Sequence, residues 1–262
     1  MKKREINHIS IVISTRNASE YVERCLDSAI SQNYPDYEII FLDAQSNDGT
    51  FEKALTYTDK FENIRIIQNQ IRKYQGENIR IGTEMSKPKS IIITLDGDDW
   101  FPHANVLARV NVEYAKHDCW MTYGTYEEFP KRSVSHIYRE YPIEVRKNKT
   151  FRQYQWLASH LRTFRRELFL KINPEDMKDP TTGNYVSMAP DLSFQFPMLE
   201  MCGVDKSRYL PDILYVYNRE NPMNESKINQ AEINRIEKLL RERPVYETLD
   251  FLYEEQKDLM HE

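Results

Sequence analysis

The stretch from Ser90 to Trp100 constrains the fold more than any other part of the chain. Residues 91–95 form a short, β-branched apolar run, which is typical of a strand buried on both faces of a parallel sheet. Asp96, Asp98 and Asp99 follow at once. Carboxylates this close together repel one another unless a positive charge lies among them. A hard cation such as Mg²⁺ or Mn²⁺, completed by water and substrate phosphates, would supply it, and the alternative is a solvated acidic turn.

Length and composition narrow the class of protein. The 262 residues are enough for one large domain, and 40% hydrophobic with 29% charged residues is typical of a globular protein. The net charge of -5 argues against a general nucleic-acid binder, although a basic stretch at residues 162–166 could meet a phosphate. Three widely separated cysteines, Cys25, Cys119 and Cys202, indicate reduced thiols and a cytoplasmic protein. Because no apolar run has the length of a membrane span, we expect any membrane contact to be peripheral.

Strand-like and helix-like segments alternate in the first half. We expect strands over residues 8–14, 37–42, 64–68 and 91–95, and helices over 18–31, 50–60 and 76–85. Strands separated by single helices form a parallel sheet with right-handed crossovers, and ligands bind beyond the carboxyl ends of its strands. Asp43 and Asp96 both stand at such ends.

The second half is less regular. The expected elements are a helix over residues 103–117, a strand over 120–126, a long excursion over 129–149 that could cover a site, helical segments over 151–172, a loop over 174–190, a helix over 192–201, one or two strands over 209–218 and a charged amphipathic helix over 227–243. We interpret the last helix as an element that packs on the domain or forms a dimer, and the second alternative would make the protein a homo-oligomer. Its basic side chains could also touch anionic lipid.

Five stretches, taken in order, closely resemble the family 2 glycosyltransferases, whose fold is called GT-A. They are residues 10–17 (SIVISTRN), 25–32 (CLDSAISQ), 38–43 (EIIFLD), 46–50 (SNDGT) and 95–99 (LDGDD). The resemblance implies an α/β fold with a mostly parallel, Rossmann-like sheet flanked by helices and a helical C-terminal extension. It implies one GT-A domain over residues 1–225, with a nucleotide-sugar-binding half (1–100) and an acceptor-binding half (101–225), and an extension over 226–262.

The resemblance also implies a metal-dependent reaction, in which Mn²⁺ or Mg²⁺ assists an inverting transfer of a sugar, in our interpretation a hexose. The donor would be a nucleotide sugar, with a UDP-sugar favoured, and the acceptor a hydroxyl of a glycan, a lipid or a protein-linked group. Thr15 and Arg16 match the positions that hold the base and ribose, and Asp43 matches the aspartate that accepts a hydrogen bond from uracil.

The Asp-x-Asp motif of the family corresponds to Asp96, Gly97 and Asp98. Asp98 would ligate the metal, and Asp96 would bind the ribose or the metal through water. The family often has a second acidic residue after the position of Asp43, where this chain has Ala44. Recognition of the base or ribose is therefore expected to be looser or to be arranged differently.

Further candidates lie in the second half of the chain. The resemblance implies Asp191 as the catalytic base, although its usual Glu partner is Pro190 here, and an ordinary helix N-cap is the alternative. Arg219 stands where family members carry a loop that folds over the diphosphate, and a solvated arginine is the alternative. His160 and Trp156 are weaker candidates for acceptor binding, with structural packing as the alternative.

A second function class stays open from the sequence. A protein that kept this fold but lost catalysis would use the cleft as a nucleotide- or glycan-binding module. Ala44 and Pro190 favour that alternative, whereas the intact motif from Asp96 to Asp98 favours an enzyme. The sequence does not identify the sugar or the acceptor, because donor and acceptor choice depend on a few groups around each substrate.

Overall fold

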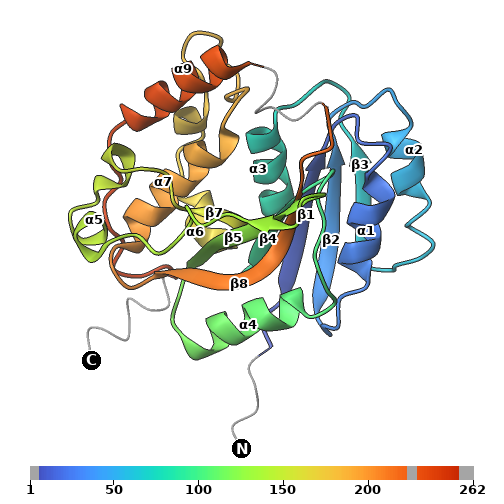
Figure 1. The fold of residues 1–262 in the computed structure, drawn as a ribbon, viewed down its shortest axis with the longest axis horizontal. Helices are drawn as coiled ribbons and strands as arrows, with labels where there is room; N and C mark the ends of the chain where they lie inside the picture. Colours follow the sequence, from blue (N-terminus) through green and yellow to red (C-terminus); the bar gives the residue numbers. More distant parts are fainter. Residues whose placement is uncertain (1–5, 223–228, 254–262) are drawn as a thin grey trace, which may run out of the picture.

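The computed structural model describes residues 6–222 and 229–253. Its centre is a mixed sheet with the strand order β3-β2-β1-β4-β7-β5-β6, and β8 pairs with β5 (Figure 1). The strands are β1 (Ile9–Thr15), β2 (Tyr37–Asp43), β3 (Ile64–Gln68), β4 (Ile91–Asp96), β5 (Met121–Phe129), β6 (Ser133–Val134), β7 (Ser159–Arg165) and β8 (Ser207–Asn218).

The first four strands are parallel, as the sequence predicts. β1 lies between β2 and β4, with Thr15 opposite Asp43 and Ser14 opposite Asp96. The apolar residues of β1 and β4 are buried on both faces of the sheet, which explains their continuous runs of Ile, Val and Leu. This register places the carboxyl ends of all three strands at one edge of the sheet.

Helices cover both faces of the sheet (Figure 1). They are α1 (Val22–Ile30), α2 (Thr50–Leu55), α3 (Gln75–Met85), α4 (Val106–Lys116), α5 (Ile143–Lys147), α6 (Arg166–Leu170), α7 (Pro190–Cys202) and α9 (Gln230–Arg241), with short 3₁₀ segments η1 (Thr150–Gln153) and η2 (Pro174–Met177). One core joins α1, α2 and α4 to the sheet, and a second core joins α3, α6, α7 and α9 to its other face. The predicted α/β class, a mostly parallel sheet with flanking helices, is confirmed.

One expectation was wrong. Helical segments were expected over residues 151–172, but Ser159–Arg165 is the strand β7, which lies antiparallel to both β4 and β5. The helical prediction holds only for η1 and α6. Polar side chains of β7 are buried by partners elsewhere in the fold, so the sequence shows no apolar strand pattern there.

The predicted C-terminal helix is α9, and it packs on α7 and η1. Residues 227 and 228, where that helix was expected to begin, and the expected boundary at 225/226 lie outside the described residues.

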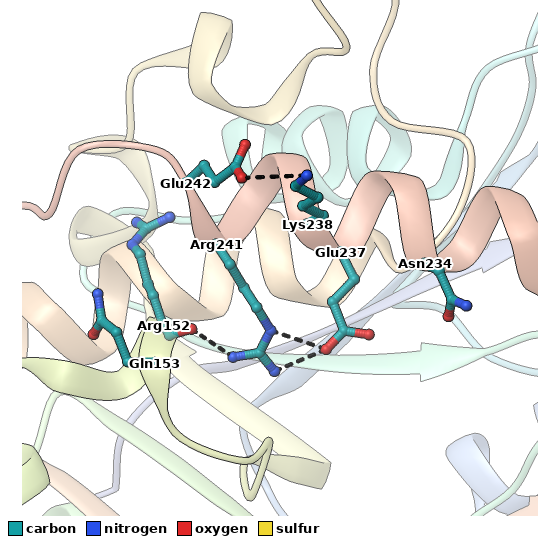
Figure 2. A pocket seen from close by; sticks show the side chains of 7 residues that line it. All are labelled: Arg152, Gln153, Asn234, Glu237, Lys238, Arg241 and Glu242. Carbon is teal, nitrogen blue, oxygen red and sulfur yellow. Dashed lines mark hydrogen bonds and ion pairs between the residues drawn. The ribbon is translucent and has the colours of Figure 1, made fainter.

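A shallow pocket of about 470 Å³ lies between α9 and η1 (Figure 2). Arg241 pairs with Glu237 of the same helix at 2.8 Å and donates to the carbonyl oxygens of Arg152 at 2.7 Å and Tyr154 at 2.9 Å, which fastens α9 to η1 and the residue after it. Among the described residues, no helix combines the length and hydrophobicity needed to cross a bilayer.

Candidate active site

A cleft of about 470 Å³ opens at the carboxyl ends of β1 and β4. Five of the predicted site residues line it together, namely Thr15, Arg16, Asp96, Gly97 and Asp98. The position agrees with the rule that open parallel sheets bind ligands beyond the carboxyl ends of their strands. Polar groups that converge in a concave site are typical of ligand binding.

The two carboxylates of the Asp-x-Asp motif are oriented by amides. Asp98 Oδ2 accepts a hydrogen bond from Asn221 Nδ2 at 2.7 Å, and Asp96 Oδ1 accepts one from Gln75 Nε2. Burial raises the pKa of Asp96 to about 6; the charge of Arg162 opposes this, and the charges of Asp98 and Asp191 add to it. Burial also raises the pKa of Asp98, against the hydrogen bond from Asn221. The cleft therefore holds acidic groups for which a cation would be a favourable neighbour.

The donor set fits a hard cation that keeps part of its shell for substrate. It offers carboxylate oxygens, which suit Mg²⁺ or Mn²⁺. No group of three or more His, Cys, Asp or Glu side chains with metal-binding geometry occurs among residues 6–222 and 229–253. Two carboxylates alone match a cation that is bound jointly with water and phosphate oxygens, rather than a cation in a closed protein cage.

Gly97 allows the motif to lie directly against β1. A Cβ atom at this position would lie 2.2 Å from Oγ1 and 2.3 Å from Cβ of Thr15. The Thr15 hydroxyl is itself buried without a hydrogen-bond partner in the structure. The floor of the cleft is thus formed by close contact between the ends of β1 and β4.

The third acid of the cluster, Asp99, has a structural role. It is 1% exposed and accepts hydrogen bonds from Tyr215 Oη at 2.6 Å and from the Asn218 backbone N–H at 2.7 Å. The Tyr215 hydroxyl in turn accepts a hydrogen bond from the backbone N–H of Asp96 at 3.2 Å. Asp99 therefore ties the end of β8 to the end of β4 and holds the motif in place.

Asp43, the candidate base ligand, lies behind the cleft surface. It is fully buried, and its Oδ2 accepts hydrogen bonds from the backbone N–H of Ser46 at 2.9 Å and from Gln68 Nε2 at 3.1 Å. Its Oδ1 is buried without a partner. The neighbouring Ala44 lines the cleft in its place.

Asp191, the candidate base, is in the first turn of α7. The helix begins at Pro190 with Ala189 as its N-cap residue, so Asp191 is not the cap. Its Oδ2 accepts a hydrogen bond from Arg162 Nη2 at 3.0 Å. Asp191 does not line the cleft. Its charge raises the pKa of Asp96, but this effect is smaller than those of burial and Asp98, which also raise that pKa, and of Arg162, which lowers it.

The remaining candidates lie outside the cleft lining. His160 is 4% exposed and stacks on Tyr215 with a centroid distance of 4.1 Å. Trp156 is half-buried and packs edge-on against Phe196. Nη2 of Arg219 pairs with Oε1 of Glu128 at 2.7 Å. The guanidinium carbon of Arg219 also lies 4.5 Å from the ring centroid of Tyr217, which lines the cleft. The structure gives each of these side chains a packing or pairing role, and their substrate roles stay predictions.

Sequence reasoning missed the connection between β3 and α3. Arg72, Lys73 and Tyr74 from this segment line the cleft together with Gln75, the first residue of α3. A basic and aromatic run immediately before a helix was the available signal, because crossover loops of a parallel sheet gather at the same edge as the strand ends. Asn221, which follows β8, was also missed, since long-range contacts such as its bond to Asp98 leave no local pattern.

Solved structures share the fold. Staphylococcus aureus TarS 1-349 in complex with UDP-GlcNAc has a TM-score of 0.66 at 16% identity, covering 89% of this chain and 66% of that chain. The mannosyltransferase PcManGT from Pyrobaculum calidifontis, solved with GDP-Man and Mn²⁺, has a TM-score of 0.56 at 16% identity, covering 81% of this chain and 57% of that chain. The fold is that of the GT-A glycosyltransferases, as the sequence resemblance implied.

A family model places the chain more narrowly. The model described as "Glycosyl transferase family 2" matches residues 10–172, and the chain belongs to this family. A Methanococcus voltae relative, named as dolichyl N-acetyl-alpha-D-glucosaminyl phosphate 3-beta-D-2,3-diacetamido-2,3-dideoxy-beta-D-glucuronosyltransferase, is 42% identical over 72 residues. That match covers 26% of this chain and 22% of the relative, so it spans only part of the relative's length.

Proposed function

We propose that the protein is an inverting hexosyltransferase that uses a UDP-sugar, a divalent cation and an acceptor hydroxyl. The observation that carries this proposal is the position of Asp96 and Asp98 in a cleft where β1 and β4 end. Membership of the family supports the transfer of a sugar. The structural neighbours described with UDP-GlcNAc and with GDP-Man support a nucleotide-sugar donor.

The cation in this proposal is Mn²⁺ or Mg²⁺, held by Asp98 and, directly or through water, by Asp96. When bound, it neutralises the negative charge that gathers on the diphosphate as the leaving group departs. The oxygen donors of the cleft support this assignment, as does the neighbour described with Mn²⁺. The cation site also accounts for the close spacing of the two acids in the sequence.

Basic and aromatic residues of the cleft are suited to the rest of the donor. Arg16, Arg72 and Lys73 bring positive charge to the same cleft as the two aspartates, where they would bind phosphate oxygens. Tyr74 and Tyr217 also line it and offer rings on which the base or the sugar can stack. Donor binding in this proposal therefore uses the β3–α3 connection as well as the predicted strand ends.

Asp191 is the proposed general base. An attacking hydroxyl must lose its proton as it bonds to the sugar carbon, and a carboxylate on the side away from the diphosphate can accept that proton. A single displacement of this kind inverts the configuration at the carbon. The position of Asp191 in the first turn of α7, with its charge acting on Asp96, supports the assignment.

One observation favours the second candidate, a binding module without catalysis. The candidate base Asp191 is not among the residues that line the cleft. For the enzyme hypothesis, the name of the Methanococcus voltae relative includes a dolichyl-linked sugar phosphate, which supports a lipid-linked hydroxyl as the acceptor to test. Peripheral contact with a membrane on the cytoplasmic side would bring such an acceptor to the cleft.

A donor panel tests the proposal. UDP, GDP and TDP and their sugars, each with and without Mn²⁺, are compared by thermal shift, because a ligand that binds the folded state raises its melting temperature. We expect a UDP-sugar with Mn²⁺ to give the largest shift and slow release of UDP to follow. Binding without any release of UDP, even with acceptor, would favour the binding module. The absence of a metal-dependent shift with all of these nucleotides would contradict the enzyme and a nucleotide-binding module alike.

A further inference from the structure

Arg162 connects the candidate base to a buried histidine. Arg162 and His160 are two residues apart in β7, and their side chains are in contact. Arg162 is 8% exposed and His160 is 4% exposed. Nη2 of Arg162 lies 3.0 Å from Nε2 of His160 and 3.0 Å from Oδ2 of Asp191. One guanidinium nitrogen thus contacts both side chains.

The chemistry of the guanidinium decides the roles of its partners. Arginine has N–H donors and no acceptor, so Nε2 of His160 and Oδ2 of Asp191 must both accept. A histidine that accepts at Nε2 is neutral and carries its proton on Nδ1. Burial lowers the pKa of His160 well below its usual value, and the charges of Arg162 and Arg219 act in the same direction. His160 is therefore a neutral acceptor in this cluster.

The histidine ring is itself fixed by the end of β4. It stacks on Tyr215, whose hydroxyl donates to Asp99 Oδ2 and accepts from the backbone N–H of Asp96. Contacts therefore run without a gap from the Asp-x-Asp motif through Tyr215 and His160 to Arg162. His160 therefore contacts the same guanidinium nitrogen, Nη2, that donates to Asp191.

We propose that Arg162 is a positioning residue for the transfer reaction, holding the carboxylate of Asp191 while His160 fixes the guanidinium. This inference rests on the proposed function, in which Asp191 takes the proton of the acceptor. Arg162 acts through Asp191, because Nη2 of Arg162 donates directly to Oδ2 of that residue at 3.0 Å. A charge-assisted hydrogen bond restricts the rotation of the carboxylate, and that restriction is what places a base in line with a hydroxyl.

The first test needs no turnover. Long-range ¹H–¹⁵N spectra of the full chain, labelled at histidine, distinguish the two neutral tautomers from the imidazolium, and loss of a signal in His160→Gln assigns it. We expect the Nδ1–H tautomer of His160 at pH 7 and a changed Nε2 shift in Arg162→Gln. The signal of His8, which lies 2.7 Å from Asp36, should not move between wild type and Arg162→Gln. A proton on Nε2 of His160, or an Nε2 shift that ignores Arg162→Gln, would overturn the proposal.

The second test measures UDP release from the UDP-sugar selected by the donor panel, with Mn²⁺. We expect Arg162→Gln to lower kcat by about 100-fold with the donor KM changed less than about twofold, since a small displacement of a catalytic group costs on that order. The kcat of Arg162→Lys, which keeps the charge, should lie between those of the wild type and Arg162→Gln. Arg165→Gln is the matched control, because Arg165 lies in the same strand but donates to Asn7 at 2.9 Å. Its kcat should stay at the wild-type value.

The outcomes separate this inference from the proposed function. Wild-type kcat in Arg162→Gln, or a loss confined to the donor KM, overturns the role of Arg162 while the transferase stands. Failure of the wild type to release UDP from any donor overturns the proposed function, and with it the positioning role. If Arg162→Gln does not fold, as judged by circular dichroism, Arg162→Lys gives both measurements instead, and an unchanged kcat and Nε2 shift in that variant overturn the proposal.

Discussion

Arg152 and Glu200 form an ion pair in the interior of the protein, with Nε 2.5 Å and Nη2 2.9 Å from the two carboxylate oxygens. The side chains are 3% and 0% exposed. Nη1 of Arg152 also donates to the carbonyl oxygen of Leu240 in α9, so the pair links η1, α7 and the C-terminal helix. The pair thus joins three segments that are far apart in the sequence.

Glu200→Gln should strongly destabilise the protein. The change leaves the buried guanidinium of Arg152 without its counter-charge, and breaking one side of a buried pair costs about 3 to 5 kcal/mol. Glu237→Gln is the control, because Glu237 pairs with Arg241 at the surface pocket and such pairs contribute less than about 1 kcal/mol. Urea unfolding measures both variants. Equal losses in the two would contradict a special role for the interior pair.

Gly97→Ala should distort the floor of the cleft. The added methyl would lie 2.2 Å from Thr15 Oγ1, so β1 and β4 must separate, and overpacking of this kind costs about 1 to 3 kcal/mol. Gly76→Ala is the control, since its added methyl meets other atoms only at 3.6 Å and beyond. We expect weaker binding of UDP with Mn²⁺ and a lower urea midpoint only in Gly97→Ala. Normal binding and stability in that variant would refute the contact.

Asp98→Ala should remove the metal-dependent part of nucleotide binding. Groups outside the first coordination shell already account for about 10- to 100-fold in metal affinity, so loss of a ligand should weaken binding of UDP by more than about 100-fold. Isothermal calorimetry with Mn²⁺ measures the change. Asp212→Ala is the control, because Asp212 pairs with Arg109 on the surface. The same dissociation constant in Asp98→Ala and wild type would rule out Asp98 as a ligand.

Asp191→Asn tests the base. Asparagine keeps an oxygen that can accept the hydrogen bond of Arg162 but cannot take a proton from the acceptor. General base catalysis contributes about 10² to 10⁴ in rate, so kcat should fall by a factor in that range while calorimetric binding of the donor is retained. Near-normal turnover in this variant would show that the base is another group.

The carboxylate of Glu38 should make stability fall in acid. Burial alone would raise its pKa, but hydrogen bonds with His8 and Ser10 and the charge of Arg65 bring it from 4.5 to about 2. A pKa depressed in the folded state stabilises the protein above the unfolded value of 4.5, and that contribution is lost as the pH falls toward 2. The difference between the folded-state pKa of about 2 and the unfolded-state pKa of 4.5 corresponds to about 3 kcal/mol of folding stability at neutral pH.

Urea midpoints between pH 3.5 and 7 measure the effect of Glu38→Gln. The variant should be less stable than wild type at pH 7, and the difference should shrink toward pH 3.5. Glu62→Gln, at an exposed position, is the control and should follow the wild-type curve. A difference that is constant across this range would show that Glu38 acts through packing and not through its charge.

The parallel half of the fold could be predicted because local signals agree there. The apolar runs of β1, β2 and β4, separated by amphipathic helices, allow little besides a parallel sheet. Parallel topology then brings the strand ends to one edge, which explains why the sequence alone places the Asp-x-Asp motif together with Thr15.

The antiparallel strand β7 could not be predicted in this way. β7 reads Ser-His-Leu-Arg-Thr-Phe-Arg, and its polar residues are buried because Asp191 lies against Arg162, and because Thr122 and Tyr114 hydrogen-bond to Thr163. These partners are 29 to 49 residues away in the chain. Burial created by distant partners leaves no periodicity in the local sequence.

The place of β7 in the sheet has a consequence for protein engineering. This strand follows β5 in the chain but lies between β4 and β5, so the first hundred residues and the rest form two adjacent blocks of one sheet that meet where β4 pairs with β7. A hybrid enzyme spliced at residue 100 would need an incoming segment whose own strand matches the edge of β4. Exchanging donor preference between relatives is therefore better attempted by changing single loops than by trading whole halves.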